Sequence, residues 1–475
     1  MKAVGVQSRL PIAERYRATR ALWSIVLALA WLLFRVSPAA GQQDPGEVAE
    51  TPDVDHGAPL GTEDYMGPAI LSRGDQPAIG GAQYNTIQPF LSLNRIYGTG
   101  LNGLSGSAPN ALQSGVDLGY GLKVTHRWKR TTLTIDYNGS YRDYTGATTG
   151  NGLNQFLAAT AVSQLTRHLV LSIRQAGGIL KQDIGGLLLQ PAFLENSSTL
   201  PTNEPFSNGM KLIDSVATLT YQKTRRLSFS GSIAGSLVRQ DSPLLVGTNS
   251  SIVSGDLGYR LSSRSTIGID YSFSHFGYTT FGSGDVQSAG VDYSWRATRT
   301  LDLALQAGIA HASTVGLAVV PIDPALAALL GDSAAIQASY RTINAPSINA
   351  RITKRWRRAS VNMSYLEGIS PGNGLVLTSK QESLTAGLQY SNAKRWTVSI
   401  QAGRTTMDQL ATAGSYSGNT FAASFSHLVR PGIQAVARFS VQPVNYIGEG
   451  GLDRTYYRGD IGFIFTPSAR PIALR

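Results

Sequence analysis

The chain has 475 residues, of which 42% are hydrophobic and 15% charged, and its formal net charge is +11 at pH 7. It contains no cysteine, which excludes disulfides, thiolate metal sites and a lipidated N-terminal cysteine. After residue 34 no apolar run is long enough to cross a membrane as a helix, which excludes a helical membrane protein. A β-barrel remains possible, because its strands place only alternate residues on lipid.

Residues 1–41 have the pattern of a secretory signal peptide. Basic residues precede the apolar stretch Ala21–Phe34, and the small residues Ser37–Gly41 follow it. The apolar stretch is shorter than the ~20 residues that a spanning helix needs. We therefore expect export, with cleavage after Ala39 or Gly41.

The next segment, residues 42–82, is rich in proline, glycine and acidic residues and shows no hydrophobic periodicity. Such a composition predicts a largely disordered segment, which would lie in the periplasm. The positive charge of the chain lies further on, in short turns rather than along one helix or groove. Nucleic-acid binding is therefore not predicted.

From residue 83 to residue 475, runs of alternating apolar and polar residues are separated by eight short basic or polar turns. Ile267, Ile269, Tyr271 and Phe273, for example, alternate with polar or small residues. A period of two predicts half-buried strands. The eight turns, here called the knots, are Arg127–Arg130, Thr166–His168, Lys223–Arg226, Ser262–Ser265, Arg296–Arg299, Lys354–Arg358, Ala393–Trp396 and Val429–Pro431.

Eight knots that each join two strands predict an all-β fold, a transmembrane antiparallel up-and-down β-barrel of about 18 strands, or about 16 if the region near Tyr84 does not pair. In such barrels the short turns and both termini face the periplasm, and the longer loops face the exterior. We expect longer exterior loops at 181–209 and 313–344. The second contains Asp323–Gly331, which has the capping pattern of a short helix and is a candidate for narrowing the pore.

Tryptophan separates a barrel from a soluble β-sandwich, which would show the same alternation. Beyond the predicted signal peptide the chain has Trp128, Trp295, Trp356 and Trp396, and all four lie in or beside a knot. Indole rings prefer the membrane–water interface, so an interfacial girdle is predicted at this end, with the knot cations meeting lipid phosphates. Tyrosines near the other strand ends are expected to form the opposite girdle: Tyr144, Tyr278, Tyr365, Tyr416 and Tyr446.

Three stretches carry a resemblance to a known group of proteins. Gly67–Arg73, Pro89–Leu93 and the turn-plus-strand unit Arg127–Tyr137 resemble uncharacterised, porin-like outer-membrane β-barrels of Gram-negative bacteria. The resemblance implies a cell outer-membrane location, contact with outer-membrane lipids and insertion by the barrel assembly machinery. Such barrels commonly end on an aromatic residue, whereas here Thr466–Arg475 follows the last predicted strand, so the assembly signal is internal or the tail folds back.

Charged residues on the polar register of the strands are the candidates for lining a pore. Cross-strand ion pairing would keep the wall rigid, whereas a mixed electrostatic filter would select polar solutes. Acids and bases are similar in number, which argues against strong selectivity for one ion sign. The pore-lining candidates are Asp136, Arg142, Arg174, Asp256, Asp270, Asp292, Asp302, Arg351, Arg438 and Arg458, with Asp117, Lys123, Asp214 and Asp460 on the same register.

Sequence motifs for cofactor binding, metal binding or catalysis are weak in this chain. Gly98–Gly103 fits a dinucleotide-binding pattern but lacks the strand–turn–helix context that this motif needs. The six histidines show no metal-ligand spacing, and no serine stands out as a nucleophile. No cofactor, metal site or catalytic residue is predicted.

The leading prediction is a porin-like channel for passive or weakly selective diffusion of small hydrophilic solutes. An export conduit or scaffold barrel for a polysaccharide or protein partner is the alternative, and an outer-membrane hydrolase is a weaker one. A receptor with ~22 strands and a plug domain does not fit the knot count. The sequence does not predict the oligomeric state.

Overall fold

The structure is a computed structural model that describes residues 84–99, 111–146, 151–180, 209–242, 245–321, 323, 334–392, 396–411, 414–448, 451–467 and 470–471. The predicted signal peptide, the acidic segment 42–82 and most of the expected loop 181–209 lie outside these residues. Among the residues described, no helix is long and apolar enough to cross a membrane.

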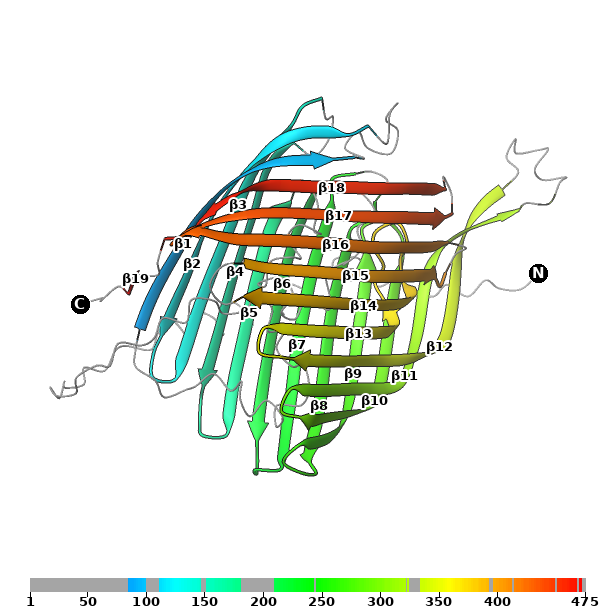
Figure 1. Cartoon of the computed structure of the whole chain (residues 1–475). Helices are drawn as coiled ribbons and strands as arrows, with labels where there is room; N and C mark the ends of the chain where they lie inside the picture. Colours follow the sequence, from blue (N-terminus) through cyan, green and yellow to red (C-terminus); the bar gives the residue numbers. More distant parts are fainter. Residues whose placement is uncertain are drawn as a thin grey trace, which may run out of the picture. The chain divides into compact units, whose positions relative to one another are not determined.

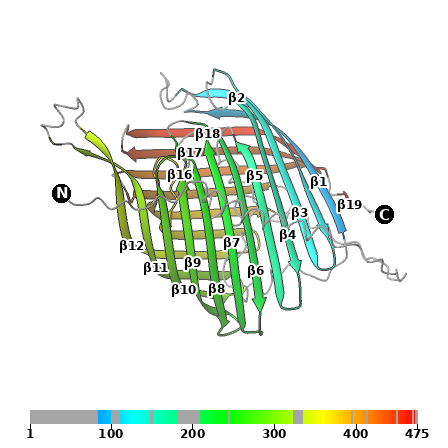
Figure 2. The same cartoon turned by 180° about the vertical axis from the view of Figure 1, so that it is seen from behind.

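The described residues form one antiparallel sheet that closes on itself, with consecutive strands as neighbours (Figures 1 and 2). The first nine strands are β1 (Tyr84–Gly98), β2 (Gln113–Arg127), β3 (Thr131–Tyr144), β4 (Gly152–Gln164), β5 (Leu169–Leu180), β6 (Met210–Gln222), β7 (Leu227–Gln240), β8 (Thr248–Arg260) and β9 (Ser265–Tyr278). The others are β10 (Ser283–Thr298), β11 (Leu301–Pro321), β12 (Ala334–Arg355), β13 (Ala359–Ser370), β14 (Ser379–Asn392), β15 (Trp396–Gln409), β16 (Ser415–Arg430), β17 (Ile433–Ile447), β18 (Leu452–Phe465) and the short β19 (Arg470–Pro471).

Pairing of β1 with β18 closes the ring. Leu91 lies opposite Phe465, and Gly98 lies opposite Arg458. The predicted all-β, up-and-down barrel is therefore confirmed, with β1–β18 as its wall. Of the two predicted strand counts, 18 is correct, because Tyr84 belongs to the first strand.

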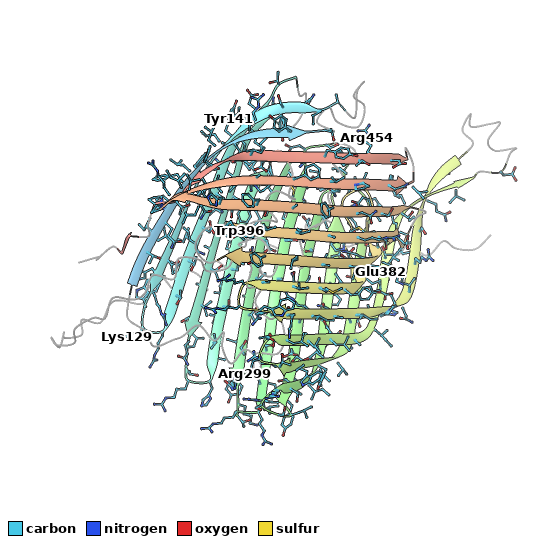
Figure 3. All side chains as sticks on the ribbon, viewed as in Figure 1. Lys129, Tyr141, Arg299, Glu382, Trp396 and Arg454 are labelled. Carbon is cyan, nitrogen blue, oxygen red and sulfur yellow. The ribbon has the colours of Figure 1, made fainter. Side chains whose placement is uncertain are left out.

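The knots join strands at one end of the barrel, here called the knot end. The first of them is a tight turn, closed by a backbone hydrogen bond from the N–H of Trp128 to the carbonyl of Thr131 (2.8 Å). Figure 3 shows Lys129 and Arg299 at this end and Arg454 and Glu382 at the other, here called the loop end. The prediction that the knots share one end is confirmed by the strand order for the seven knots that the structure describes, and residues 393–395 of the eighth lie outside the described residues.

The expectation of a loop over 313–344 is wrong. Residues up to Pro321 belong to β11 and residues from Ala334 belong to β12, and the two strands stay paired as far as Pro321 opposite Ala334. This ribbon projects past the ends of its neighbours (Figures 1 and 2). These residues form strands because the alternation of apolar and polar residues continues through them instead of giving way to turn residues. The expected helix Asp323–Gly331 lies outside the described residues apart from Asp323.

The chain folds back after β18. Residues Arg470 and Pro471 pair with Ile87 and Thr86 on the part of β1 that extends past the end of β18. The tail thus follows the second of the two expected arrangements and covers part of an open sheet edge, the kind of edge that otherwise invites pairing with other chains.

The two faces of the sheet differ in chemistry. Large apolar residues are widely exposed on the outward face, as at Ile269 (55%), Ile309 (66%) and Leu93 (56%). The strand neighbours of Ile269 and Leu93 on the inward face are polar or small, and Asp117 and Asp214 on that face are buried. Because side chains alternate along a strand, this arrangement gives an apolar exterior around a polar interior.

The two ends should be distinguishable on intact cells, because the chain has no native cysteine. We expect Phe281→Cys, at the loop end, to react with a maleimide attached to a polymer too large for the pore. Ser263→Cys, in an exposed knot, should react only after the cells are broken. Labelling at position 263 together with protection at position 281 would reverse the orientation.

Candidate functional site: the barrel interior and its strap

The interior near the knot end is lined by small polar side chains that bond across strands. The hydroxyls of Ser232 and Ser254 lie 2.7 Å apart, and those of Ser399 and Ser424 lie 2.6 Å apart. Such pairs satisfy hydroxyl groups without filling the space between the walls. This half of the barrel therefore has a polar interior surface.

Three of the predicted pore-lining acids lie together on β8, β9 and β10, and we call them the acidic arc. Asp256 faces Asp270 directly across β8 and β9, and Asp292 follows on β10. Gln306 donates to Asp270 (2.7 Å), and Ser230 donates to Asp256 (3.4 Å).

Glycines make room for the carboxylates of this arc. Asp292 lies opposite Gly268, and Asp270 lies opposite Gly290. A Cβ at either glycine would collide with the facing carboxylate. The sequence thus keeps several like charges close together on one wall, where mutual repulsion favours a nearby cation.

The opposite part of the ring carries more bases than acids. Arg438 donates to Asp460 (2.9 Å), and Arg142 donates to Asp117 (2.9 Å). These belong to β17, β18, β2 and β3, half the ring away from the acidic arc. Lys123 lies opposite Asp136 in register, and Arg458 lies opposite Ser440.

The remaining predicted charges are distributed around the ring. Arg174 and Asp214 form a buried ion pair at 3.2 Å. Asp302 accepts from Arg296 (3.0 Å) and lies 3.4 Å from Arg355. Arg351 lies opposite Ala304 and Ser364. The predicted residues are therefore not one cluster.

The four tryptophans lie at the knot end. Trp295 and Trp396 are on the outward face, and the ring of Trp396 lies 5.0 Å from that of Tyr390. Trp128 and Trp356 sit in the turns and are half-exposed, with Lys354 Nζ 5.9 Å from the Trp356 ring.

The expected outer tyrosine girdle is wrong. Tyr144, Tyr278 and Tyr416 are buried on the inward face, and Tyr446 is on that face too. Only Tyr365 of the expected set points outward, where it donates to Glu367 (2.9 Å). The strand register decides this, because each of the four shares a register with polar inward residues.

The interior near the loop end is also less polar than predicted. Apolar clusters form there around Phe156 and Leu212, around Phe276 and Val286, and around Met407 and Tyr416. The inner register is therefore polar in the knot half and partly apolar in this half.

An inward-folded segment, Pro371–Thr378, explains much of this packing, and we call it the strap. It connects β13 to β14, and it can be followed between them in Figure 1. Gly372 (φ 83°) and Gly374 (φ 90°) adopt left-handed backbone conformations that favour glycine. Asn373 Oδ1 accepts the N–H groups of Leu375 and Val376, which fixes the turn.

The strap reaches both sides of the interior. On one side, the hydroxyl of Tyr278 in β9 donates to the carbonyl of Pro371 (3.0 Å) and lies 2.7 Å from the hydroxyl of Thr378. The N–H of Val246 donates to the carbonyl of Gly374 (3.0 Å). On the other side, Val376 is fully buried in a cluster whose other members are Met407, Tyr416, Val444 and Tyr456, from β15–β18.

The strap therefore lies across the lumen at the loop end, between β9 and β15–β18, and narrows it. Sequence reasoning missed the strap and assigned the narrowing to residues 313–344. The sequence does contain a pattern that could have predicted the strap. Glycine and asparagine turn residues are followed by the apolar run Leu375–Leu377, which is unusual for an exterior loop exposed to water.

Within the residues that the structure describes, no group of three or more histidine, cysteine, aspartate or glutamate side chains is placed to hold a metal ion. No protein-family model matches the sequence, and no curated protein matches it either.

Several solved structures match this chain, at low sequence identity and low structural similarity. Pseudomonas aeruginosa OpdQ is 10% identical, with a TM-score of 0.41, and the match covers 82% of this chain and 98% of that one. Pseudomonas aeruginosa OccK5 (OpdH) is 12% identical, with a TM-score of 0.40 and coverage of 82% and 99%. The Pseudomonas aeruginosa outer membrane protein OpdK is 9% identical, with a TM-score of 0.41 and coverage of 80% and 98%.

Proposed function

We propose that the protein is an outer-membrane channel for passive, weakly selective diffusion of small hydrophilic solutes. The observation that carries the proposal is the closed barrel whose knot half has a polar interior and whose loop half is narrowed by the strap. A wall of this many strands encloses enough room for water. Polar groups such as Ser232 and Asp292 would be costly to leave in a dry interior.

The outward face supports the membrane placement. Its exposed apolar residues would face acyl chains, and the outward or turn tryptophans at the knot end would lie at one interface. Exposed turn cations, such as Lys129, Arg299 and Arg358, would meet lipid phosphates there. In this arrangement the knot end is periplasmic, the lipids of the outer membrane surround the wall, and the barrel assembly machinery inserts it.

The interior charges support the weak selectivity. A solute passing through the barrel would have the acidic arc on one wall in the knot half, and on the opposite wall the Arg438–Asp460 pair of β17 and β18 and, nearer the loop end, the Arg142–Asp117 pair of β3 and β2. Opposite signs on facing walls favour polar solutes that align with the field, and they exclude neither ion sign strongly. No catalytic step is assigned to the protein.

Reconstitution tests the proposal. Purified protein in a planar bilayer should conduct ions with weak selectivity, and proteoliposomes should swell in a small sugar such as arabinose. A protein that inserts as a closed barrel yet neither conducts nor admits arabinose, even without the strap, would contradict the channel and favour the scaffold or export alternative.

The acidic arc should set part of the ion preference. The triple variant Asp256→Asn, Asp270→Asn, Asp292→Asn removes three negative charges from the lumen with little change in volume. We expect the reversal potential in a salt gradient to shift toward anion preference. Asp285→Asn, on the outward face of β10, is the matched control and should leave the potential unchanged. No shift in the triple variant would mean that solutes do not pass this wall.

A further inference from the structure

The seam between β12 and β13 is only partly paired. The two strands are in register from Arg355 opposite Ser360 to Ile348 opposite Glu367, and there the pairing stops. On β12 residues 334–347 continue toward the loop end, and on β13 residues 368–370 do so, without pairing with each other. The wall therefore has a break that begins at the height of Glu367.

Local sequence explains where the break starts. Pro346 has no N–H to offer a ladder, and Gly368 provides no side chain to pack. Gly368 is on the inward face, and a Cβ added there would meet nothing within 4 Å, so the space on the lumen side of the break is open. Beyond the break the strands diverge: β12 runs out into the projecting ribbon, while β13 turns inward into the strap (Figures 1 and 2).

Apolar side chains lie directly behind the break. Ile343 of β12, Ile369 of β13 and Leu377 of the strap pack against the interior cluster that contains Phe276 and Leu410. The upper part of β12 is braced by this inner layer instead of by β13, because Arg341 Nη1 donates to the carbonyl of Leu410 (3.0 Å). An apolar surface thus reaches from the interior to the break in the wall.

The outward face changes its chemistry at the same height. Below the break, Ile352 and Met363 are exposed and apolar. At the break, Glu367 pairs with Lys380 (2.9 Å) beside Glu382, which faces Glu367 across β13 and β14. In a membrane, the top of the acyl chains and the beginning of the polar headgroups would lie at this height.

We infer that the break is a lateral portal through which amphipathic small molecules, with one acyl or alkyl chain and a polar head, pass between the lumen and the outer leaflet. The chain of such a molecule fits the apolar layer of Ile343, Ile369 and Leu377, while its head stays beside the charged residues at Glu367. This inference rests on the proposed channel function, since the lumen must be open to one aqueous side. It extends that function to solutes that partition into the membrane.

Closing the break with a disulfide tests the portal, because the chain has no cysteine of its own. Ala345→Cys with Ser370→Cys places two inward residues opposite each other if the register of β12 and β13 continues past Ile348. Asn349→Cys with Leu366→Cys is the matched control, since those residues already face each other in the paired part. Free-thiol titration reports whether each disulfide has formed.

The readout is the transfer of a fluorescent lysophosphatidylcholine across proteoliposome membranes, measured by back-extraction with albumin, which is too large for the lumen. Wild-type protein should accelerate transfer, the oxidised 345–370 variant should lower it to the protein-free rate, and reduction should restore it. The oxidised control should transfer like the wild type. Gly368→Trp fills the open space beside the break and should also block transfer, so the test does not depend on disulfide formation.

Ion conductance and arabinose swelling separate the two proposals. Both should persist in the oxidised 345–370 variant. Wild-type protein that conducts but does not accelerate lysophospholipid transfer, or transfer unaffected by the disulfide and by Gly368→Trp, would overturn the portal and leave the channel standing. Loss of conduction and swelling in every variant would instead remove the channel itself.

Discussion

Replacing the strap Pro371–Thr378 by an Asn-Gly turn should raise the single-channel conductance severalfold. The strap lies across the lumen between Tyr278 on β9 and the cluster of Met407 and Tyr416 on β15 and β16, so its removal widens the narrowed part. The barrel wall should survive, because Ser370 already faces Ser379 and a two-residue turn can join them. Planar-bilayer recording measures the change.

Two single substitutions sharpen this experiment. Tyr278→Phe removes the hydroxyl that holds Pro371 and Thr378 but keeps the ring, so brief current steps to higher conductance are expected. Phe281→Ala alters an exposed aromatic residue of the same rim and should change nothing. A turn variant with wild-type conductance would show that the strap does not limit flow.

Placing arginine on the outward face should destabilise the barrel strongly. Ile269 is 55% exposed on that face, and its cross-strand neighbours Leu257 and Val291 are apolar. At mid-membrane Ile269→Arg should cost about 2–4 kcal/mol of unfolding free energy, because a charge must be held in hydrocarbon. Denaturant titration of protein folded in lipid vesicles measures the loss.

The inward face provides the matched control. Gln401→Arg introduces the same side chain at an exposed position of the inner register of β15, and it should change the unfolding free energy little. Trp396→Tyr, which keeps an amphipathic aromatic ring beside Tyr390, should also be mild. Equal losses for Ile269→Arg and Gln401→Arg would mean that the outward face does not meet lipid.

The sequence by itself determined the class of fold, because alternation is a local property. Ile267, Ile269, Tyr271 and Phe273 must share one face of a strand whatever that strand pairs with. The knots determined where strands turn, and Trp295 beside a knot indicated which end is aromatic. Alternation also predicts that Tyr278 points inward, because Tyr278 is an even number of residues from Asp270 on the same strand. The prediction of an outer tyrosine girdle did not take this into account.

The register between strands was beyond the sequence, because it depends on which lengths of neighbouring strands align. Asp256 faces Asp270 only in the register that β8 and β9 adopt, and the β12–β13 break exists only because their pairing stops at Ile348. Residues 313–321 and 334–344 look like a long loop until each is seen to have the other as its partner.

The strap was decided by tertiary structure alone. Gly372, Asn373 and Gly374 predict a turn, but nothing local says whether Val376 should point to water or into the barrel. Its place is set by Tyr278, Met407, Tyr416 and Tyr456, which come from distant strands. The apolar strap is buried against an apolar surface and hydrogen-bond partners that several distant strands form together. That surface exists only after the barrel has closed.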